Sequence, residues 1–163
     1  MPTFPNAEYI WSAREFAYFK ELNEKNTLPT TPFLDSIEPV FHAGLARLVD
    51  MDHVIVGDKD DGVWMEPATG HTPGHVTIHV KGGGTEAIMT GDIIHHPILF
   101  LEPGLATQHD VDKAECDRTR QRLLERLSDT RDLLLTAHFC APTAGRVHSC
   151  QHGFRFQYLE ENA

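Results

Sequence analysis

The sequence predicts an α/β fold that combines helices with a succession of short strands. Apolar residues recur at helical spacing in the first third of the chain and again in Lys113–Leu127. From Val63 onward, short alternating segments separated by glycine-containing turns indicate a succession of strands. The chain has 163 residues and no internal repeat or linker, so we expect one domain over 1–163.

The first third is predicted to combine short strands with two helices. Glu8–Ile10 is the first expected strand. Ser12 is the expected N-cap of a helix over Ala13–Leu22, because a glutamate follows it three residues later. A second helix is predicted over Asp35–Val49 from the near-helical spacing of its apolar residues. His53–Val56 then has the composition of a strand.

The middle of the chain is rich in predicted strands. Val63–Glu66, Val76–Val80 and Ala87–Thr90 are the expected strands, and Gly82–Gly84 forms the hairpin turn between the last two. Ile98–His109 is an apolar segment interrupted by proline and glycine, which predicts a loop that forms a wall or lid.

The last third is predicted to hold one long helix and two strands. Asp112 is the expected N-cap of the helix Lys113–Leu127, whose apolar residues fall on one face. Leu133–Thr136 is predicted to be a buried strand, and the alternating segment Phe154–Tyr158 the last one.

The composition excludes several classes of partner. The chain has 24 acidic and 14 basic residues, a net charge of −10, and no basic stripe, so we expect neither nucleic acid nor an anionic membrane as a partner. It has no run of about 18 apolar residues that could cross a membrane, and Met1–Tyr9 lacks the apolar region of a signal peptide. Cys116, Cys140 and Cys150 are an odd number without zinc-knuckle spacing, which favours a reduced, cytoplasmic protein.

Histidine and aspartate residues occur at the ends of three predicted strands. The turn Thr69–His75 leads directly into a strand, Asp92 follows a second strand and His138 follows a third. Any one of them alone is more typical of a solvated turn or a helix cap. Together they place imidazole and carboxylate groups at junctions where side chains from separate strands can converge. Zinc, iron and manganese accept these ligands.

Three motifs at these positions closely resemble the later metal-binding motifs of the metallo-β-lactamase superfamily. They are Gly70-His71-Thr72-Pro73-Gly74-His75, Thr90-Gly91-Asp92 and Ala137-His138-Phe139. The separations of 17 residues between positions 75 and 92 and of 46 residues between positions 92 and 138 also fit. Three further segments resemble the branch of lactonase-like and methyl-parathion-hydrolase-like enzymes: Phe4–Tyr9, Ile94–Pro97 and Pro142–Arg146.

The resemblance implies half of an αββα sandwich, in which a mixed, largely antiparallel sheet is flanked by helices, with a site for two metal ions. His75 would bind the first metal, Asp92 would bridge both and be the catalytic residue, and His138 would bind the second. In the superfamily a metal-bound hydroxide attacks the substrate. A small ester or lactone is therefore the expected substrate, and zinc, or another divalent metal such as iron or manganese, the expected cofactor. Three further histidines would support the ligands or line the pocket: His71, His95 and His96.

The superfamily's earlier motif, His-x-His-x-Asp-His, is absent from this sequence. We therefore expect the chain to correspond to the C-terminal half of the fold, through a naturally short gene, a misassigned start codon or a truncation. Each metal of a pair would keep only two protein ligands, fewer than a catalytic zinc normally has. A single metal held by His75, Asp92 and His138 is the arrangement we prefer.

Two main functions are compatible with this partial resemblance. The first is a metal-dependent hydrolase of small esters or lactones, impaired by the missing half. The second is a catalytically inactive half-domain that self-associates or pairs with a separate N-terminal half. A third interpretation is a metal-independent binding module that uses Ile98–His109. Because the two sheets of a sandwich cover each other's apolar faces, a chain with one sheet is expected to form a homodimer.

Overall fold

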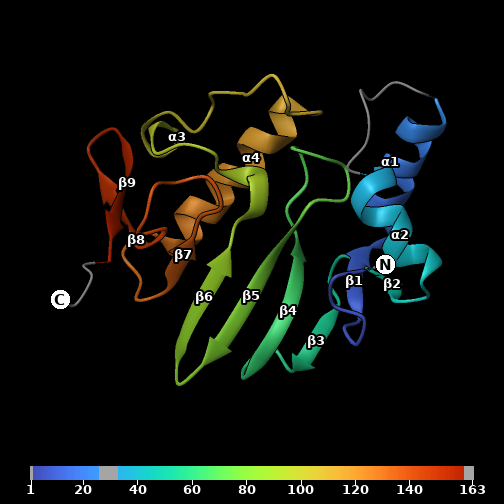
Figure 1. Ribbon diagram of the computed structural model, residues 1–163. Coiled ribbons are helices and arrows are strands. Elements are labelled where there is room, and N and C mark those ends of the chain that lie inside the picture. Colours follow the sequence, from blue (N-terminus) through green and yellow to red (C-terminus); the bar gives the residue numbers. More distant parts are fainter. Residues whose placement is uncertain (1, 26–32, 160–163) are drawn as a thin grey trace. The chain divides into compact units, whose positions relative to one another are not determined.

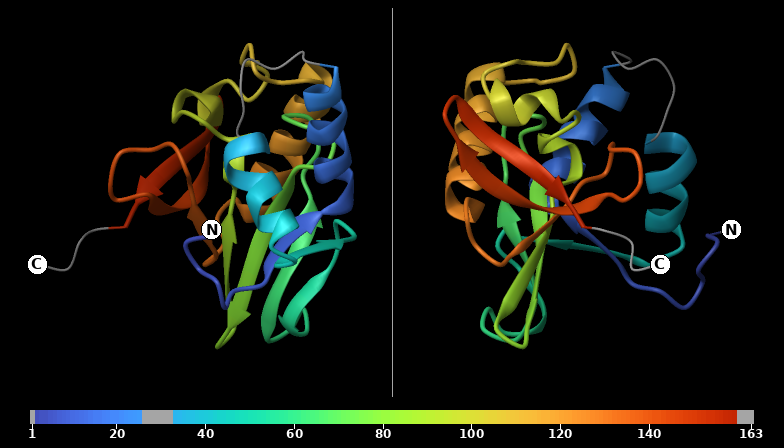
Figure 2. Two further views of the ribbon diagram at one scale, coloured as in Figure 1. Left: turned by 45° about the vertical axis from the view of Figure 1, so that its right-hand side comes forward. Right: turned by 90° about the vertical axis from the view of Figure 1, so that its left-hand side faces the viewer.

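The computed structural model describes residues 2–25 and 33–159 of the chain (Figure 1, Figure 2). The chain forms two compact units, Met1–Met51 and Asp52–Ala163, which are described separately. Among the described residues, no helix combines the length and the apolar character that crossing a membrane requires.

The first unit is a two-stranded parallel sheet with helices. Its elements are β1 (Tyr9–Ser12), α1 (Ala13–Glu24), a π-helical turn (Phe33–Ile37), α2 (Glu38–His42) and β2 (Ala46–Val49). As predicted, Ser12 caps α1, because its Oγ accepts a hydrogen bond from the Glu15 backbone N–H at 3.3 Å. The Phe16 ring of α1 packs against Phe33 and Phe41, at centroid distances of 5.7 and 4.9 Å.

The prediction of one helix over Asp35–Val49 is wrong. α2 ends at His42, and Gly44 then adopts φ +71°, a left-handed conformation that commonly ends helices. The apolar residues after this glycine belong to β2 instead. That strand pairs with β1, with Tyr9 opposite Ala46.

The second unit is built on a seven-stranded sheet in the order β3-β4-β5-β6-β7-β8-β9. The strands are β3 (Val54–Gly57), β4 (Gly62–Pro67), β5 (Val76–Gly82), β6 (Thr85–Met89), β7 (Leu133–Leu135), β8 (Ala144–Cys150) and β9 (Gly153–Tyr158). All neighbours are antiparallel except β6 and β7, which are parallel. The predicted mixed, largely antiparallel sheet is therefore confirmed.

Three helical segments accompany this sheet. They are the 3-10 turn η2 (Gly91–Ile93), α3 (Ile98–Leu101) and α4 (Lys113–Leu127). α4 has its predicted bounds, and Asp112 caps it by accepting the Glu115 backbone N–H at 2.9 Å. The segment Ile98–His109, predicted to be a loop, contains α3, which buries Leu99 and Phe100 in the core.

α4 covers one face of the sheet. Its residues Leu123 and Leu124 share a core cluster with Ile88 of β6 and Leu134 of β7. On the opposite face, cross-strand pairing produces two apolar rows: Val63, Val80, Ala87 and Leu133, and Met65, Ile78, Met89 and Leu135. Because residues directly opposite each other in a sheet share a face, this second face is apolar across four strands.

The parallel pairing of β6 with β7 determines where two polar segments meet. Met89 lies opposite Leu135 at the ends of the two strands, and the Thr90 backbone N–H then donates to the Leu135 carbonyl at 3.0 Å. Parallel strands run in one direction, so the segments that follow them leave the sheet at the same edge. Asp92 and His138, 46 residues apart in the sequence, come together there.

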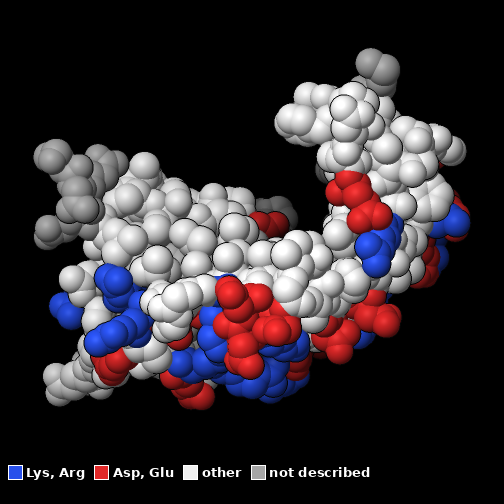
Figure 3. All heavy atoms as spheres, turned by 90° about the horizontal axis from the view of Figure 1, so that it is seen from below, with Lys and Arg blue, Asp and Glu red and all other residues white. Residues whose placement is uncertain are grey.

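Charges of both signs are intermixed on the molecular face of Figure 3. Lys and Arg side chains lie next to Asp and Glu side chains, and broad neutral areas separate these mixed groups. Among the described residues, that face therefore carries no large region of a single sign.

Candidate metal site

Four histidines and one aspartate gather at the edge of the sheet where β6 and β7 end. They come from the turn before β5, the segment around η2 and the segment after β7. We call these five residues the metal-site cluster: His71, His75, Asp92, His95 and His138. His96, the remaining histidine of the predicted set, is exposed. Its Nδ1 accepts the Ile98 backbone N–H at 3.1 Å within a local turn, and its supporting role at the site stays a prediction.

The turn before β5 is held rigidly against the start of α4. Gly70 has φ +129°, and a Cβ at this position would lie 2.2 Å from the backbone N of Cys116, so the close approach requires glycine. The Gly70 carbonyl accepts the Asp112 backbone N–H at 2.9 Å, and the His71 carbonyl accepts that of Val111 at 3.1 Å. These contacts fix the backbone that carries His71.

Asp92 contacts two of the histidines through its two carboxylate oxygens. His138 Nε2 lies 2.8 Å from Oδ1, and His71 Nε2 lies 3.5 Å from Oδ2. Burial alone would raise the pKa of Asp92, but the hydrogen bond to His138 and the nearby imidazoles outweigh it and lower that pKa. The group is therefore an ionised carboxylate at neutral pH, the form that binds metal.

His95 supplies a buried nitrogen without a partner. Its ring stacks on His138 at a centroid distance of 4.5 Å and lies 5.2 Å from His71. Its Nδ1 is buried and has no hydrogen-bond partner among the described residues. Burial is the main cause that lowers the pKa of His95, which keeps the imidazole neutral and its lone pair available.

The metal-site cluster has side chains of suitable type and separation to bind a metal ion. His71, Asp92 and His95 each offer one ligand atom, and these atoms all lie within 4.8 Å of one another. Imidazole and carboxylate together suit zinc, iron or manganese. Among the described residues, His95 Nδ1 in the cluster and His148 Nε2 outside it are the buried side-chain nitrogens without a hydrogen-bond partner, so the convergence of the three ligand atoms is what distinguishes the cluster.

His75 is placed differently from its expected role. Its Nε2 accepts the Asp92 backbone N–H at 3.0 Å, and its Nδ1 lies 3.0 Å from the Ala68 carbonyl. Burial, reinforced by His71, lowers the pKa of His75 to about 4, so it is neutral. Both ring nitrogens are engaged by backbone groups. The role of His75 as a ligand stays a prediction, and the geometry favours a structural role that holds the Asp92 peptide.

His71, and not His75, directs a ring nitrogen at the Asp92 carboxylate, as was expected of a metal ligand. Its Nδ1 lies 3.1 Å from Asp110 Oδ1, while its Nε2 points to Asp92. Burial would raise the pKa of Asp110, but hydrogen bonds from Thr107, His71 and Cys116 lower it. Sequence reasoning missed Asp110, because an aspartate two residues before a helix N-cap resembles an ordinary turn residue.

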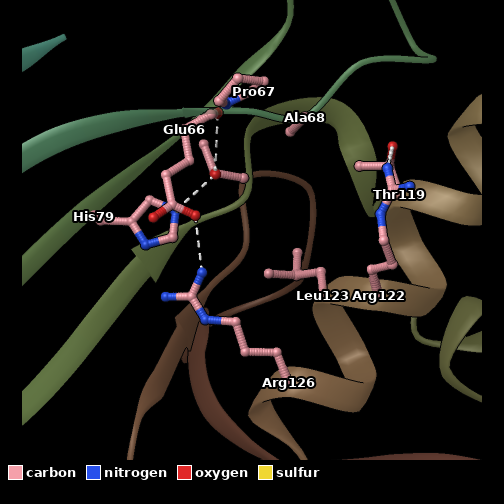
Figure 4. Close-up of a pocket in the computed structure, with 9 residues that line it drawn as sticks. Glu66, Pro67, Ala68, His79, Thr119, Arg122, Leu123 and Arg126 are labelled. Atoms are coloured by element: carbon pink, nitrogen blue, oxygen red, sulfur yellow. Dashed lines mark hydrogen bonds and ion pairs between the residues drawn. The ribbon is translucent and has the colours of Figure 1, made fainter. Parts of the chain in front are cut away.

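A second group of histidine and carboxylates lies between the sheet and α4 (Figure 4). We call it the α4 network, and its members are Glu66, His79, Glu86 and Arg126. His79 is buried, with Nδ1 at 2.5 Å from Glu86 Oε1 and Nε2 at 2.8 Å from Thr77 Oγ1. Arg126 donates to Glu66 at 2.8 Å and to Glu86 at 2.6 Å. The network borders a cavity of about 150 Å³.

The sequence matches no protein-family profile and no curated protein. Solved structures with the same fold are nevertheless found. AbOPH, a hydrolase in the beta lactamase superfamily, has a TM-score of 0.80 at 21% identity over 98% of this chain and 57% of its own. AidC, a dizinc quorum-quenching lactonase, has a TM-score of 0.80 at 20% identity over 100% of this chain and 58% of its own.

A probable metal-dependent hydrolase from Staphylococcus aureus has a TM-score of 0.74 at 18% identity, over 98% of this chain and 55% of its own. This chain thus spans 55–58% of the length of the three proteins. At these identities the comparison establishes the fold. The resemblance expected from the motifs is confirmed at that level: the chain has the fold of metallo-β-lactamase superfamily hydrolases, over part of their length.

Proposed function

We propose that this chain carries part of a metal-dependent hydrolase that acts on small esters or lactones. The observation that carries the proposal is the convergence of His71, Asp92 and His95, each of which offers one ligand atom within 4.8 Å of the other two. The solved structures of the same fold include a dizinc lactonase and a probable metal-dependent hydrolase, which supports the reaction class.

The ligands that we propose are His71, Asp92 and His95, joined by His138 through its contact with Asp92. His71 takes the place of His75, both of whose ring nitrogens are occupied by backbone groups. Zinc is the metal we propose, with iron or manganese as alternatives. When bound, the metal would supply a Lewis acid that activates water and stabilises negative charge on the substrate oxygen.

Access for the substrate is supported by the exposure of the same residues. The side chains of Asp92 and His138 are 44% and 47% exposed, so a small carbonyl compound can approach them directly. Asp92 remains the catalytic candidate of the cluster because it contacts two of the imidazoles and is ionised.

Metal content and hydrolysis together test the proposal. We expect one zinc ion per chain by elemental analysis after dialysis, and none in Asp92→Asn. Metal-dependent hydrolysis of a phenyl ester or of an acyl-homoserine lactone is expected in the same preparation. Asp129→Asn removes a carboxylate outside the cluster and should leave both unchanged. A chain that binds no zinc and hydrolyses neither compound would contradict the proposal.

A second candidate function is a half-domain that works only with another chain. It is favoured by the two apolar rows on the sheet face opposite α4. On that face Met89 is 45% exposed, whereas Met65 is 2% exposed, so the uncovered part lies around Met89. We propose a homodimer that buries this face. Light scattering at micromolar concentration tests it, and a clean monomer would contradict self-association.

We also propose that the protein works in a reducing compartment such as the cytoplasm. Cys116, Cys140 and Cys150 are all free, and free thiols are typical of that environment. Mass spectrometry of the protein trapped with a thiol-alkylating reagent in its own cells tests this, because disulfide-linked peptides would contradict it.

A further inference from the structure

The Asp110 side chain is fully buried beside the metal-site cluster, at 0% exposure. Carboxylates are almost never fully buried unless other groups pair with them. The Thr107 backbone N–H donates to Asp110 Oδ2 at 2.7 Å, and His71 Nδ1 lies 3.1 Å from Oδ1. Cys116 donates a third hydrogen bond to this carboxylate. Asp110 is thus held in one position, with one oxygen directed at His71.

This contact determines which nitrogen of His71 carries the proton. An ionised carboxylate only accepts hydrogen bonds, so the Nδ1 of His71 must be the donor. A neutral imidazole has one N–H, and its Nε2 then presents a lone pair. That Nε2 lies 3.5 Å from Asp92 Oδ2. Two electron-rich atoms therefore point at one place in the cluster, where a cation would stabilise both.

α4 holds the far side of Asp110. Burial is the main cause that raises the pKa of Cys116 to about 12, so its thiol keeps the proton that it donates to Asp110. Arg120, 1% exposed, donates to Cys116 Sγ at 3.3 Å and to the Ile93 carbonyl at 2.9 Å. Ile93 directly follows Asp92, so a single helix supports both the carboxylate behind His71 and the peptide next to Asp92.

We propose that Asp110 is a positioning residue that fixes His71 in its Nδ1–H tautomer and presents Nε2 to the metal. The inference rests on the proposed function, because it takes His71 as a ligand. Asp129 makes a comparable contact outside the cluster, because its Oδ1 lies 3.3 Å from Nδ1 of His148. Asp129→Asn is therefore the matched control for Asp110→Asn.

Nitrogen NMR of the histidine side chains in the metal-free protein provides the first test. We expect wild-type His71 as the Nδ1–H tautomer, a readout that needs neither metal nor activity. In Asp110→Asn, the new amide can donate to Nδ1, so we expect the Nε2–H tautomer to be populated. A wild-type His71 with its proton on Nε2 would overturn the proposal even if the variant failed to fold.

Zinc titration by calorimetry provides the second test. We expect Asp110→Asn to weaken zinc binding about 10–100-fold, the range typical of residues that orient metal ligands, and Asp129→Asn to leave it within about twofold. A folded Asp110→Asn with wild-type zinc affinity would overturn the positioning role. If the wild type binds no zinc, the proposed function fails. The NMR measurement would still show whether Asp110 fixes the tautomer of His71.

Discussion

The metal-site cluster and the α4 network contain the same kinds of side chain but differ in how their buried atoms are paired. In the α4 network, both nitrogens of His79 have partners, and Arg126 contacts both carboxylates. In the metal-site cluster, His95 Nδ1 is buried without a partner among the described residues, and Asp92 is about half exposed. Residue type alone therefore does not distinguish a structural network from a candidate site.

The difference lies in the supply of hydrogen-bond donors. Arg126 brings a guanidinium to Glu66 and Glu86, so that network is complete without any added ion. Among the described residues, neither lysine nor arginine forms an ion pair with Asp92, and its side-chain partners are imidazoles. An external cation would complete this second arrangement. Loss of a residue should accordingly affect stability in the network and metal affinity in the cluster.

The largest effect is expected from His79→Ala. Removing one partner from a buried, fully paired network typically costs about 3–5 kcal/mol, and we expect a loss of that size in the free energy of unfolding measured with urea. His148→Ala, at a partly exposed histidine beside Asp129, should cost less than about 1 kcal/mol. Zinc affinity should be unchanged in both. A small loss for His79→Ala would show that the α4 network is not structural.

Asp92→Asn should show the converse pattern. We expect zinc affinity to fall at least about 100-fold, close to 3 kcal/mol, because the variant removes the only carboxylate among the three proposed ligands. The free energy of unfolding of the metal-free protein should change by less than about 1 kcal/mol, since the side chain is about half exposed. Calorimetric titration and urea unfolding measure the two quantities. A large loss of stability with intact zinc binding would reverse the assignment.

His75 should make the stability of the metal-free protein depend on pH. Its pKa is about 4 in the folded chain and about 6.5 when unfolded, so the unfolded state binds more protons between these values. The contribution of neutral His75 to the free energy of unfolding is fully present above pH 6.5. It decreases as the pH falls towards 4, by about 3 kcal/mol in total. Urea unfolding with a chelator measures it. His75→Gln should lose this pH dependence, and His96→Gln should retain it. If the free energy of unfolding changed with pH equally in the wild type and both variants, the prediction would be contradicted.

The smallest effect is expected from Arg126→Met. Its side chain is 42% exposed, so solvent screens both of its ion pairs and we expect a loss of only about 1 kcal/mol in the free energy of unfolding. Arg118→Met removes a more exposed pair with Glu115 and should cost less than about 0.5 kcal/mol. Thermal unfolding at low and high salt measures both, and an unchanged melting temperature for Arg126→Met would show that His79 and the carboxylates suffice.

Much of the second unit could be predicted because its signals are local. α4 has a capping aspartate and a long apolar face, and its bounds are as expected. The failure over Asp35–Val49 has a local cause too, since a short apolar pattern fits helix and strand alike until Gly44 ends the helix. Pairing of β2 with β1, which decides the outcome, joins residues 37 positions apart (Tyr9 and Ala46) and leaves no local trace.

The candidate site was predictable in its location but not in the roles of its histidines. Motif spacing brought together the turn before β5, Asp92 and His138, and these do meet. Whether His71 or His75 points to the Asp92 carboxylate depends on side-chain orientation, which the sequence spacing of the motifs does not determine. His71 is oriented by Asp110, 39 residues away, and a contact of that kind can be found only in three dimensions.

The parallel pairing of β6 with β7 also has a consequence for the order of folding. The hairpins from β3 to β6 join neighbours in the sequence, whereas β6 meets β7 only after a loop that contains α4 has closed. Asp92 and His138 cannot meet before that step. This contact should therefore form late in refolding, and hydrogen exchange at the Thr90 amide, which is bonded to the Leu135 carbonyl of β7, would report the docking of β7 in real time.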